Sequence, residues 1–199
     1  MEVLKTSLVP QKEIIKRALR VLKNQGAVVF PTDTVYGLLS DAANKRAVEK
    51  VFKIKKRKRT KPFPVFVKDI KTAKRLAVID GRQEKILRKH WPGRFTFILK
   101  AKNNCKLAEQ TIAKDNTIGI RAPDYRLVNI LIKKFNKPLI GTSANISDKP
   151  CSTKIKEVII QFISSKYQPD LIIDNGNLRY NKPSRVIDLT GKKEKVLRY

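Results

Sequence analysis

The sequence of 199 residues contains only two cysteines and one histidine. Cys105 and Cys151 lack the paired spacing of a disulfide framework or a zinc site, so we expect both thiols to be reduced. Because His90 is the only histidine, we expect neither a histidine-based metal centre nor a Ser-His-Asp triad. The sequence therefore predicts no metal site built from protein side chains.

Long apolar runs and glycine-rich phosphate loops are missing as well. No apolar run approaches the roughly 18 residues of a membrane span, and the N-terminus lacks the apolar core of a signal peptide. We therefore expect a cytoplasmic protein with no membrane partner. The eight glycines form neither GxxxxGK[ST] nor GxGxxG. If the protein binds a nucleotide, its phosphates must be held by cationic side chains, hydroxyls and backbone amides.

Acidic residues are scarce, since 17 Asp and Glu stand against 45 Lys and Arg, which gives a net charge of +28. Such a charge favours polyanionic ligands such as nucleic acids and nucleotides. The excess is mostly lysine and is spread along the whole chain, as a lysine-biased composition would also produce. Charge alone leaves both explanations open.

The length suits one domain, residues 1–199, able to bury roughly 70% of its unfolded surface. Helical and strand patterns alternate early and strands gather later, which predicts an α/β (α+β mixed) fold with a twisted mixed sheet and flanking helices. Apolar periodicity and capping residues predict helices over 11–24, 44–52, 70–76, 81–89, 124–135 and 152–163. Strands are predicted over 27–30, 63–67, 95–100, 117–121, 139–141, 171–174, 185–189 and 195–198.

The stretch 31–38, PTDTVYGL, follows the wholly apolar residues 27–30. Pro31 cannot continue a central strand, so the chain should enter a polar loop there. Polar loops at the carboxyl ends of buried strands are where open α/β sheets bind ligands. The alternative is an ordinary turn that caps the next helix.

Five motifs occur in one order along the chain: PTDTVYGL, KKR at 55–57, WPG at 91–93, IGIRAP at 118–123 and TSANIS at 142–147. In this order they closely resemble the YrdC-like family, the threonylcarbamoyl-adenylate synthases. The resemblance covers nearly the whole chain and implies a single α/β domain whose curved sheet lines a basic concave cleft. WPG is interpreted as packing and a turn.

The resemblance implies that K-x-R (Lys55, Arg57) and S-x-N (Ser143, Asn145) carry catalysis and ATP binding. Lys61 and Arg198 match further nucleotide positions. If 55–59 is extended, Lys55, Arg57 and Arg59 share one face, which should look into the cleft, while Lys56 and Lys58 face solvent. The alternative is a solvated basic helix end. The alternative for Asn145 is a turn over Asn145, Ile146 and Ser147 that is hydrogen-bonded to itself.

The resemblance also implies a threonine site. Its residues would be Thr34, Tyr36, Thr117, Arg121 and Ser184. The fork of Arg121 suits a carboxylate or phosphate, although a surface ion pair with Asp124 is the alternative. Asp33 is the nearest carboxylate and has no firm role. Cys151 stands where relatives often have serine.

The implied reaction joins L-threonine, bicarbonate or CO2 and ATP into threonylcarbamoyl-adenylate and pyrophosphate. A separate transferase complex would then modify tRNA, and Mg2+ would arrive with ATP. The competing hypothesis is a non-catalytic module for double-stranded RNA or tRNA, which the charge supports but the few aromatics near the cations disfavour. A carbamoyl-transferring relative is a third possibility, disfavoured because the zinc and acylphosphatase-like domains of such proteins are missing.

Overall fold

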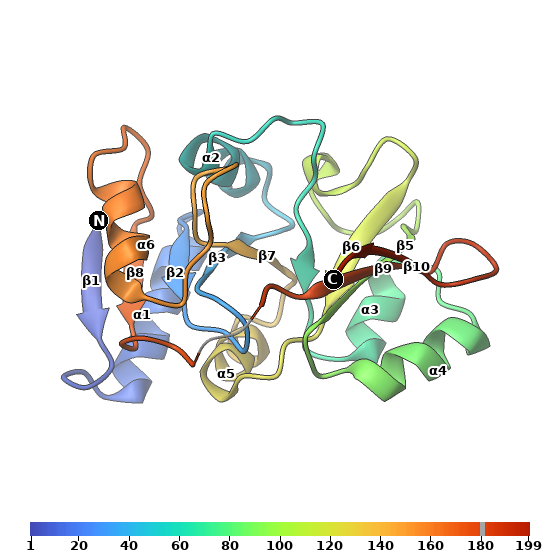
Figure 1. The fold of residues 1–199 in the computed structure, drawn as a ribbon, viewed down its shortest axis with the longest axis horizontal. Helices are drawn as coiled ribbons and strands as arrows, with labels where there is room; N and C mark the ends of the chain where they lie inside the picture. The colour runs from blue at the N-terminus through green and yellow to red at the C-terminus, as the bar shows by residue number, and fades with distance from the viewer. Residues whose placement is uncertain (180–181) are drawn as a thin grey trace.

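A computed structural model describes residues 1–179 and 182–199. One mixed sheet runs through the molecule in the order β1-β8-β2-β3-β7-β4-β6-β5-β9-β10 (Figure 1). The strands are β1 (Glu2–Lys5), β2 (Val28–Phe30), β3 (Gly37–Asp41), β4 (Val65–Phe66), β5 (Phe95–Lys100), β6 (Thr117–Arg121), β7 (Leu139–Ser143), β8 (Leu171–Asp174), β9 (Arg185–Asp188) and β10 (Lys195–Arg198). The helices are α1 (Gln11–Lys23), α2 (Lys45–Lys55), α3 (Ile70–Leu76), α4 (Gly81–His90), α5 (Arg126–Phe135), α6 (Ile155–Ile163) and the 3-10 turn η1 (Glu109–Thr111). The predicted mixed α/β fold is confirmed.

Strand β2 is buried on both faces, as its uninterrupted apolar sequence predicts. Val28 and Phe30 pack into the same apolar cluster as helices α1 and α5. Val29 points the other way and joins the cluster that contains the inner faces of α2 and α6. Figure 1 shows α1 and α5 along the lower side of the sheet and α2 at its upper side. Each fully buried aliphatic side chain contributes about 1.5–3 kcal/mol to the free energy of folding. The packing of β2 therefore fixes the point at which the following loop begins.

Capping residues begin three of the helices where the sequence predicts. Asn44 accepts the amide of Ala47, Asp69 accepts that of Thr72, and Asp80 forms a capping box with Gln83. Asp124 does not cap α5, so that prediction was wrong. Its backbone amide instead donates to Asp33 Oδ2, and α5 begins after Tyr125 without a side-chain cap.

Two strands were missed. β1 pairs in parallel with β8, its register running from Glu2 opposite Leu171 to Lys5 opposite Asp174. β3 follows directly on the 31–36 loop and pairs with β2 and β7. β1 depends on a partner distant in sequence, whereas β3 pairs both with the adjacent β2 and with the distant β7, so pairing rather than a pattern of their own specifies these strands. No helix among the described residues is long and apolar enough to span a bilayer.

Candidate active site

A cavity of about 210 Å³ opens where several strand ends meet. Its walls come from the loop after β2, the ends of α2, β6 and β7, the starts of β5 and β9, and the end of β10. The lining residues are Thr32, Thr34, Val35, Gly37, Arg57, Pro64, Phe66, Thr96, Arg121, Gly141, Thr142, Ser143, Asn145, Lys149, Cys151, Pro183, Ser184 and Arg198. Four of these described residues are cations and none is a carboxylate, so the cavity favours an anionic ligand.

Hydroxyl groups of the 31–36 loop form a chain of hydrogen bonds. Thr32 Oγ1 donates to the carbonyl of Val35 at 2.6 Å, and it lies 3.1 Å from Thr34 Oγ1. Because a hydroxyl has one proton, Thr34 must be the donor to Thr32. Thr34 Oγ1 in turn accepts from Arg121 Nη1 at 3.3 Å. These bonds hold the loop at the cavity wall, and because strand β3 follows it, the loop is not a turn that caps a helix.

Arg121 is held from three sides at the end of β6. Its Nη2 donates to Asp33 Oδ1 at 2.6 Å, its Nε to the carbonyl of Gly93 at 3.0 Å, and its Nη1 to Thr34. Burial lowers the pKa of Arg121 and the charge of Asp33 raises it, but a guanidinium stays protonated at neutral pH. Two of its five N–H groups remain for a ligand. The ion pair considered with Asp124 is wrong: the partner is Asp33, and the pair is buried.

Two more arginines line the cavity, one just after α2 and one on β10. Arg57 stacks on the Phe63 ring with 5.1 Å to its centroid and donates to the carbonyl of Lys61. Arg198 on β10 donates to the carbonyl and hydroxyl oxygens of Ser184. Burial lowers the pKa of both arginines; for Arg57 the charge of Asp148 raises the pKa and the charge of Arg198 lowers it. This repulsion between like charges would be relieved by a bound anion.

The S-x-N residues form a self-bonded turn at the end of β7. Ser143 Oγ lies 2.6 Å from Asn145 Oδ1, and the amide of Asn145 donates to the carbonyl of Ser143 at 3.0 Å. Asn145 Nδ2 donates to the carbonyls of Ile146 and Lys149. Both residues line the cavity. However, both N–H groups of the Asn145 side-chain amide are already bonded within the protein, so neither is left for a ligand. Of the Asn145–Ser147 turn considered as an alternative, only the bond from Asn145 Nδ2 to the carbonyl of Ile146 is present, because the amide of Ser147 donates to the carbonyl of Lys55.

Lys55 does not line the cavity. Its side chain is 2% exposed, and Nζ donates to the carbonyl of Ser143 at 2.6 Å, the carbonyl of Asn145 at 2.7 Å and Asn145 Oδ1 at 3.0 Å. The run after α2 is not extended, because Lys56 adopts a left-handed conformation with φ 50°. Arg59 turns outward to an exposed pair with Glu49. The prediction of a shared cleft-facing side for Lys55, Arg57 and Arg59 was therefore wrong.

Three other predicted residues lie away from the cavity. Tyr36 is fully buried. Its hydroxyl donates to the carbonyl of Gly176 at 2.6 Å and accepts from the amide of Asn175, so it attaches the 31–36 loop to the segment after β8. Thr117 begins β6, about 13 Å along the strand from Arg121, and its hydroxyl donates to Asp115. Lys61 is exposed, and its backbone carbonyl accepts a hydrogen bond from Arg57 Nε.

The structure thus brings together seven of the predicted residues: Thr34, Arg57, Arg121, Ser143, Asn145, Ser184 and Arg198. The prediction missed Lys149, Thr32, Thr96 and Phe66. Thr32 stands in the loop that the sequence singled out, so its motif could have revealed it. Phe66 and Thr96 come from strands whose apolar pattern signals only packing.

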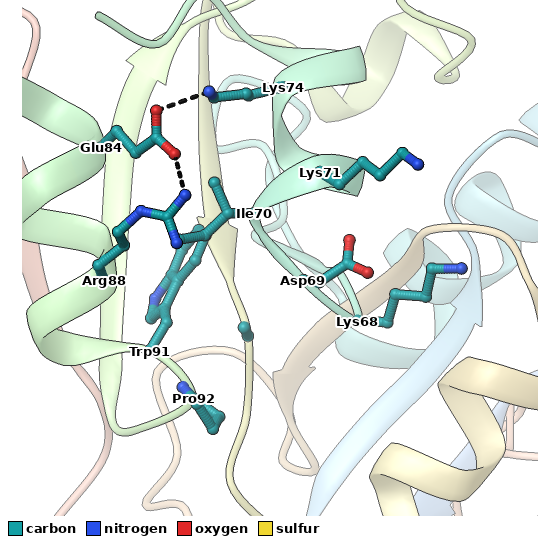
Figure 2. A pocket seen from close by; sticks show the side chains of 10 residues that line it. Lys68, Asp69, Ile70, Lys71, Lys74, Glu84, Arg88, Trp91 and Pro92 are labelled. Carbon is teal, nitrogen blue, oxygen red and sulfur yellow. Dashed lines mark hydrogen bonds and ion pairs between the residues drawn. The ribbon is translucent and has the colours of Figure 1, made fainter. Parts of the chain in front are cut away.

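A larger cavity of about 540 Å³ lies between α3 and α4 and shares no lining residue with the first. Figure 2 shows Glu84 between Lys74 and Arg88, bonded to both. These two cations lower the pKa of Glu84. Because its carboxylate already partners two of the surrounding cations, this cavity is a weaker anion site than the one at the strand ends. Its wall includes Trp91, whose predicted packing role is confirmed by 8% exposure.

A family model described as "Telomere recombination", for Sua5, YciO and YrdC proteins, matches residues 20–199. The chain belongs to the Sua5/YciO/YrdC family. A Methanocaldococcus jannaschii member, provisionally named a threonylcarbamoyl-AMP synthase, is 34% identical over 92% of this chain and 84% of its own length. The family resemblance stated from the five motifs is confirmed.

Two solved members of the Sua5/YciO/YrdC family share the fold. Pyrococcus abyssi Sua5 in complex with L-threonine superposes with a TM-score of 0.88 and 28% identity over 99% of this chain. The chain spans 56% of that Sua5 chain. Escherichia coli YciO superposes with a TM-score of 0.85 and 25% identity, covering 99% of this chain and 93% of YciO.

Proposed function

We propose that the protein is an L-threonylcarbamoyladenylate synthase. The observation that carries the proposal is the cavity at the strand ends, where four cations and several hydroxyls meet without a carboxylate. Such a lining suits one substrate with a carboxylate and another with a triphosphate. The family relatives named for this synthesis and the Sua5 complex with L-threonine support the same assignment.

In the proposed reaction the threonine amine forms a carbamate, releasing a proton when it adds to CO2 or a water molecule when it condenses with bicarbonate. A carbamate oxygen then attacks the α-phosphorus of ATP, the bond to the β-phosphate oxygen breaks, and pyrophosphate leaves. Arg121 would hold the threonine carboxylate with its two remaining N–H groups, beside Thr34. Arg57, Arg198 and Lys149 would stabilise the negative charge that spreads over the phosphates in the transition state.

Mg2+ would accompany ATP in this reaction. The donor set around the cavity does not fit a metal held by the protein, because its described lining has no carboxylate. The described residues contain no group of three or more His, Cys, Asp or Glu that could hold a metal ion. We therefore assign no step to a metal bound by these side chains.

The competing hypothesis was a non-catalytic RNA-binding module. A recess of about 210 Å³ suits a small molecule better than a duplex, which needs an extended basic surface. The modified tRNA and the separate transferase complex remain proposals that follow from the assigned product.

The test is pyrophosphate release from ATP, with threonine and bicarbonate each omitted in turn. Release should require both. Serine should replace threonine poorly but measurably, because one methyl group contributes only about 1–3 kcal/mol to discrimination. ATP turnover that continues without threonine would overturn the assignment.

A further inference from the structure

Lys55 is linked to the S-x-N turn through both its side chain and its backbone. Nζ donates to three oxygens of Ser143 and Asn145, and the carbonyl of Lys55 accepts the amide of Ser147 at 2.8 Å. An ammonium group has three protons, so these three acceptors use all of them. Lys55 therefore has no donor left for a ligand in this arrangement.

The same bonds fix the orientation of the Asn145 amide. Oδ1 receives Lys55 Nζ, which is only a donor, and Nδ2 faces two backbone carbonyls, which are only acceptors. A flipped amide would place an N–H group against the lysine and an oxygen against two carbonyls. The assignment of Oδ1 and Nδ2 is therefore determined by chemistry.

This orientation determines what Ser143 offers to the cavity. Because Asn145 Oδ1 is an acceptor, the 2.6 Å contact requires Ser143 Oγ to donate its single proton to it. Only the lone pairs of Ser143 Oγ remain for a ligand. A phosphate oxygen is also an acceptor, so it is a poor partner for this hydroxyl.

We propose that Lys55 is a positioning residue that fixes Ser143 as a hydrogen-bond acceptor for an N–H or O–H group of the bound substrate. This inference rests on the proposed function for the identity of the substrate. The group could be the threonine amine (or its carbamate N–H) or a ribose hydroxyl of ATP. The cations that meet the phosphates are then Arg57, Arg198 and Lys149, and Lys55 acts only through the turn.

The first experiment uses calorimetric titration with inorganic triphosphate, which carries negative charge but no ribose or amine. Lys55→Met should change triphosphate affinity by less than about 3-fold and leave its salt dependence unchanged, because no phosphate contact is lost. Lys56→Met is the matched control, since it removes the same charge from the adjacent exposed residue. A loss of 10-fold or more with a shallower salt slope, for Lys55→Met alone, would make Lys55 a phosphate ligand and overturn the proposal.

The second experiment identifies the partner of Ser143. Ser143→Ala should leave triphosphate affinity within about 2-fold and weaken either threonine or ATP by about 10-fold, as expected for one lost hydrogen bond. Loss of threonine affinity would identify the amine, and loss of ATP affinity alone the ribose. Weakened triphosphate binding would show that Ser143 donates to phosphate and would overturn the acceptor role.

A double-mutant cycle in the pyrophosphate assay tests whether Lys55 acts through Ser143. Lys55→Met alone should lower kcat/KM by about 10-fold for the same substrate that Ser143→Ala weakens, because Lys55 acts only through that contact. The double variant with Ser143→Ala should be no more than about 3-fold worse than the worse single variant. Multiplicative losses would contradict a shared role. If the wild-type protein releases no pyrophosphate, the proposed function fails, while the triphosphate titrations still decide the role of Lys55.

A measurement on the wild-type protein covers the case in which Lys55→Met does not fold. Brief treatment with acetic anhydride, followed by mass spectrometry, should leave Lys55 unmodified with or without triphosphate, because it is buried by the protein itself. Modification of Lys55 in the free protein that triphosphate suppresses would contradict the proposal.

Discussion

Arg121 Nη2 and Asp33 Oδ1 lie 2.6 Å apart, with the two side chains only 4% and 6% exposed. The pair joins the end of β6 to the loop after β2 across 88 residues of sequence. Asp33 Oδ2 also accepts the amide of Asp124 at 3.2 Å, so one carboxylate fixes both sides of the threonine subsite proposed here.

Asp33→Asn should be strongly destabilising, because it leaves the Arg121 charge buried without its partner. Breaking a buried ion pair typically costs about 3–5 kcal/mol. Urea denaturation would measure the loss, and threonine affinity should fall with it. Asp124→Asn is the control, since it changes an exposed carboxylate while keeping the backbone amide, and its effect should stay within about 0.5 kcal/mol. Equal effects of the two variants would show that the buried pair contributes little.

Arg57→Gln and Arg59→Gln remove equal charge from neighbouring residues with different surroundings. Arg57 lines the cavity, whereas Arg59 forms an exposed pair with Glu49. Losing a preorganised donor to developing charge costs about 3–4 kcal/mol of barrier, so Arg57→Gln should lower turnover about 100- to 1,000-fold. Arg59→Gln should stay within about 3-fold, because exposed pairs contribute about 0–1 kcal/mol. If the two variants lost equal activity in the pyrophosphate assay, Arg57 would have no role distinct from that of Arg59, and the two would act only as part of a general basic surface.

Burial, and to a lesser degree the charge of Arg57, lower the pKa of Lys55 from its ordinary 10.5 to about 7, while Cys151 opposes the change. Above that pH the amine keeps two protons for three acceptors, so activity should fall as pH rises through about 7. Stability should move the other way. Between about pH 7 and 10 the unfolded chain binds one proton more than the folded chain, so this group raises the free energy of unfolding as pH rises.

The comparison variant for this pH dependence is Lys55→Met. It should lose the activity inflection near pH 7 and flatten the corresponding rise in urea stability. Lys56→Met should keep both. An activity profile of the wild-type protein that is flat across this range would contradict the assigned role of the ammonium form.

Gly141 is required by the close approach of Phe66. A Cβ placed on Gly141 would lie 2.2 Å from Phe66 Cδ1, and the Arg121 guanidinium lies 5.5 Å from the centroid of the same ring. Gly141→Ala should therefore cost about 1–3 kcal/mol by overpacking and should also weaken threonine binding. Gly191→Ala is the control, since its nearest neighbour would be Lys193 O at 3.9 Å. Unchanged melting of the Gly141 variant would show that the ring moves freely.

Features encoded by local pattern were predicted well from the sequence. The helix over 70–76 and the strands over 95–100, 117–121, 171–174 and 195–198 coincide with observed elements. These segments combine clear periodicity with recognisable caps or turns, so local preference and tertiary packing agree. Seven of the residues that the motifs and their order singled out line one cavity.

The direction of individual side chains could not be predicted in the same way. Lys55 and Arg57 are two residues apart, which implies a shared side only in an extended segment. The helix continues through Lys55 and then turns at the left-handed Lys56, so one cation is buried beneath the S-x-N turn and the other enters the cavity. The partnership of Arg121 with Asp33 depends on two strand ends meeting in the fold, for which no local pattern exists.

The parallel placement of β8 between β1 and β2 has a consequence for synthesis on the ribosome. Until residues 171–174 have emerged, the edge of β2 at Val28–Val29 has no partner, and β1 cannot join the sheet. An unpaired apolar edge on a nascent chain is a site of aggregation. Arg198 then completes the cavity from the last strand, so a chain halted before β8 would be unable to bind substrate and would be the form most in need of a chaperone.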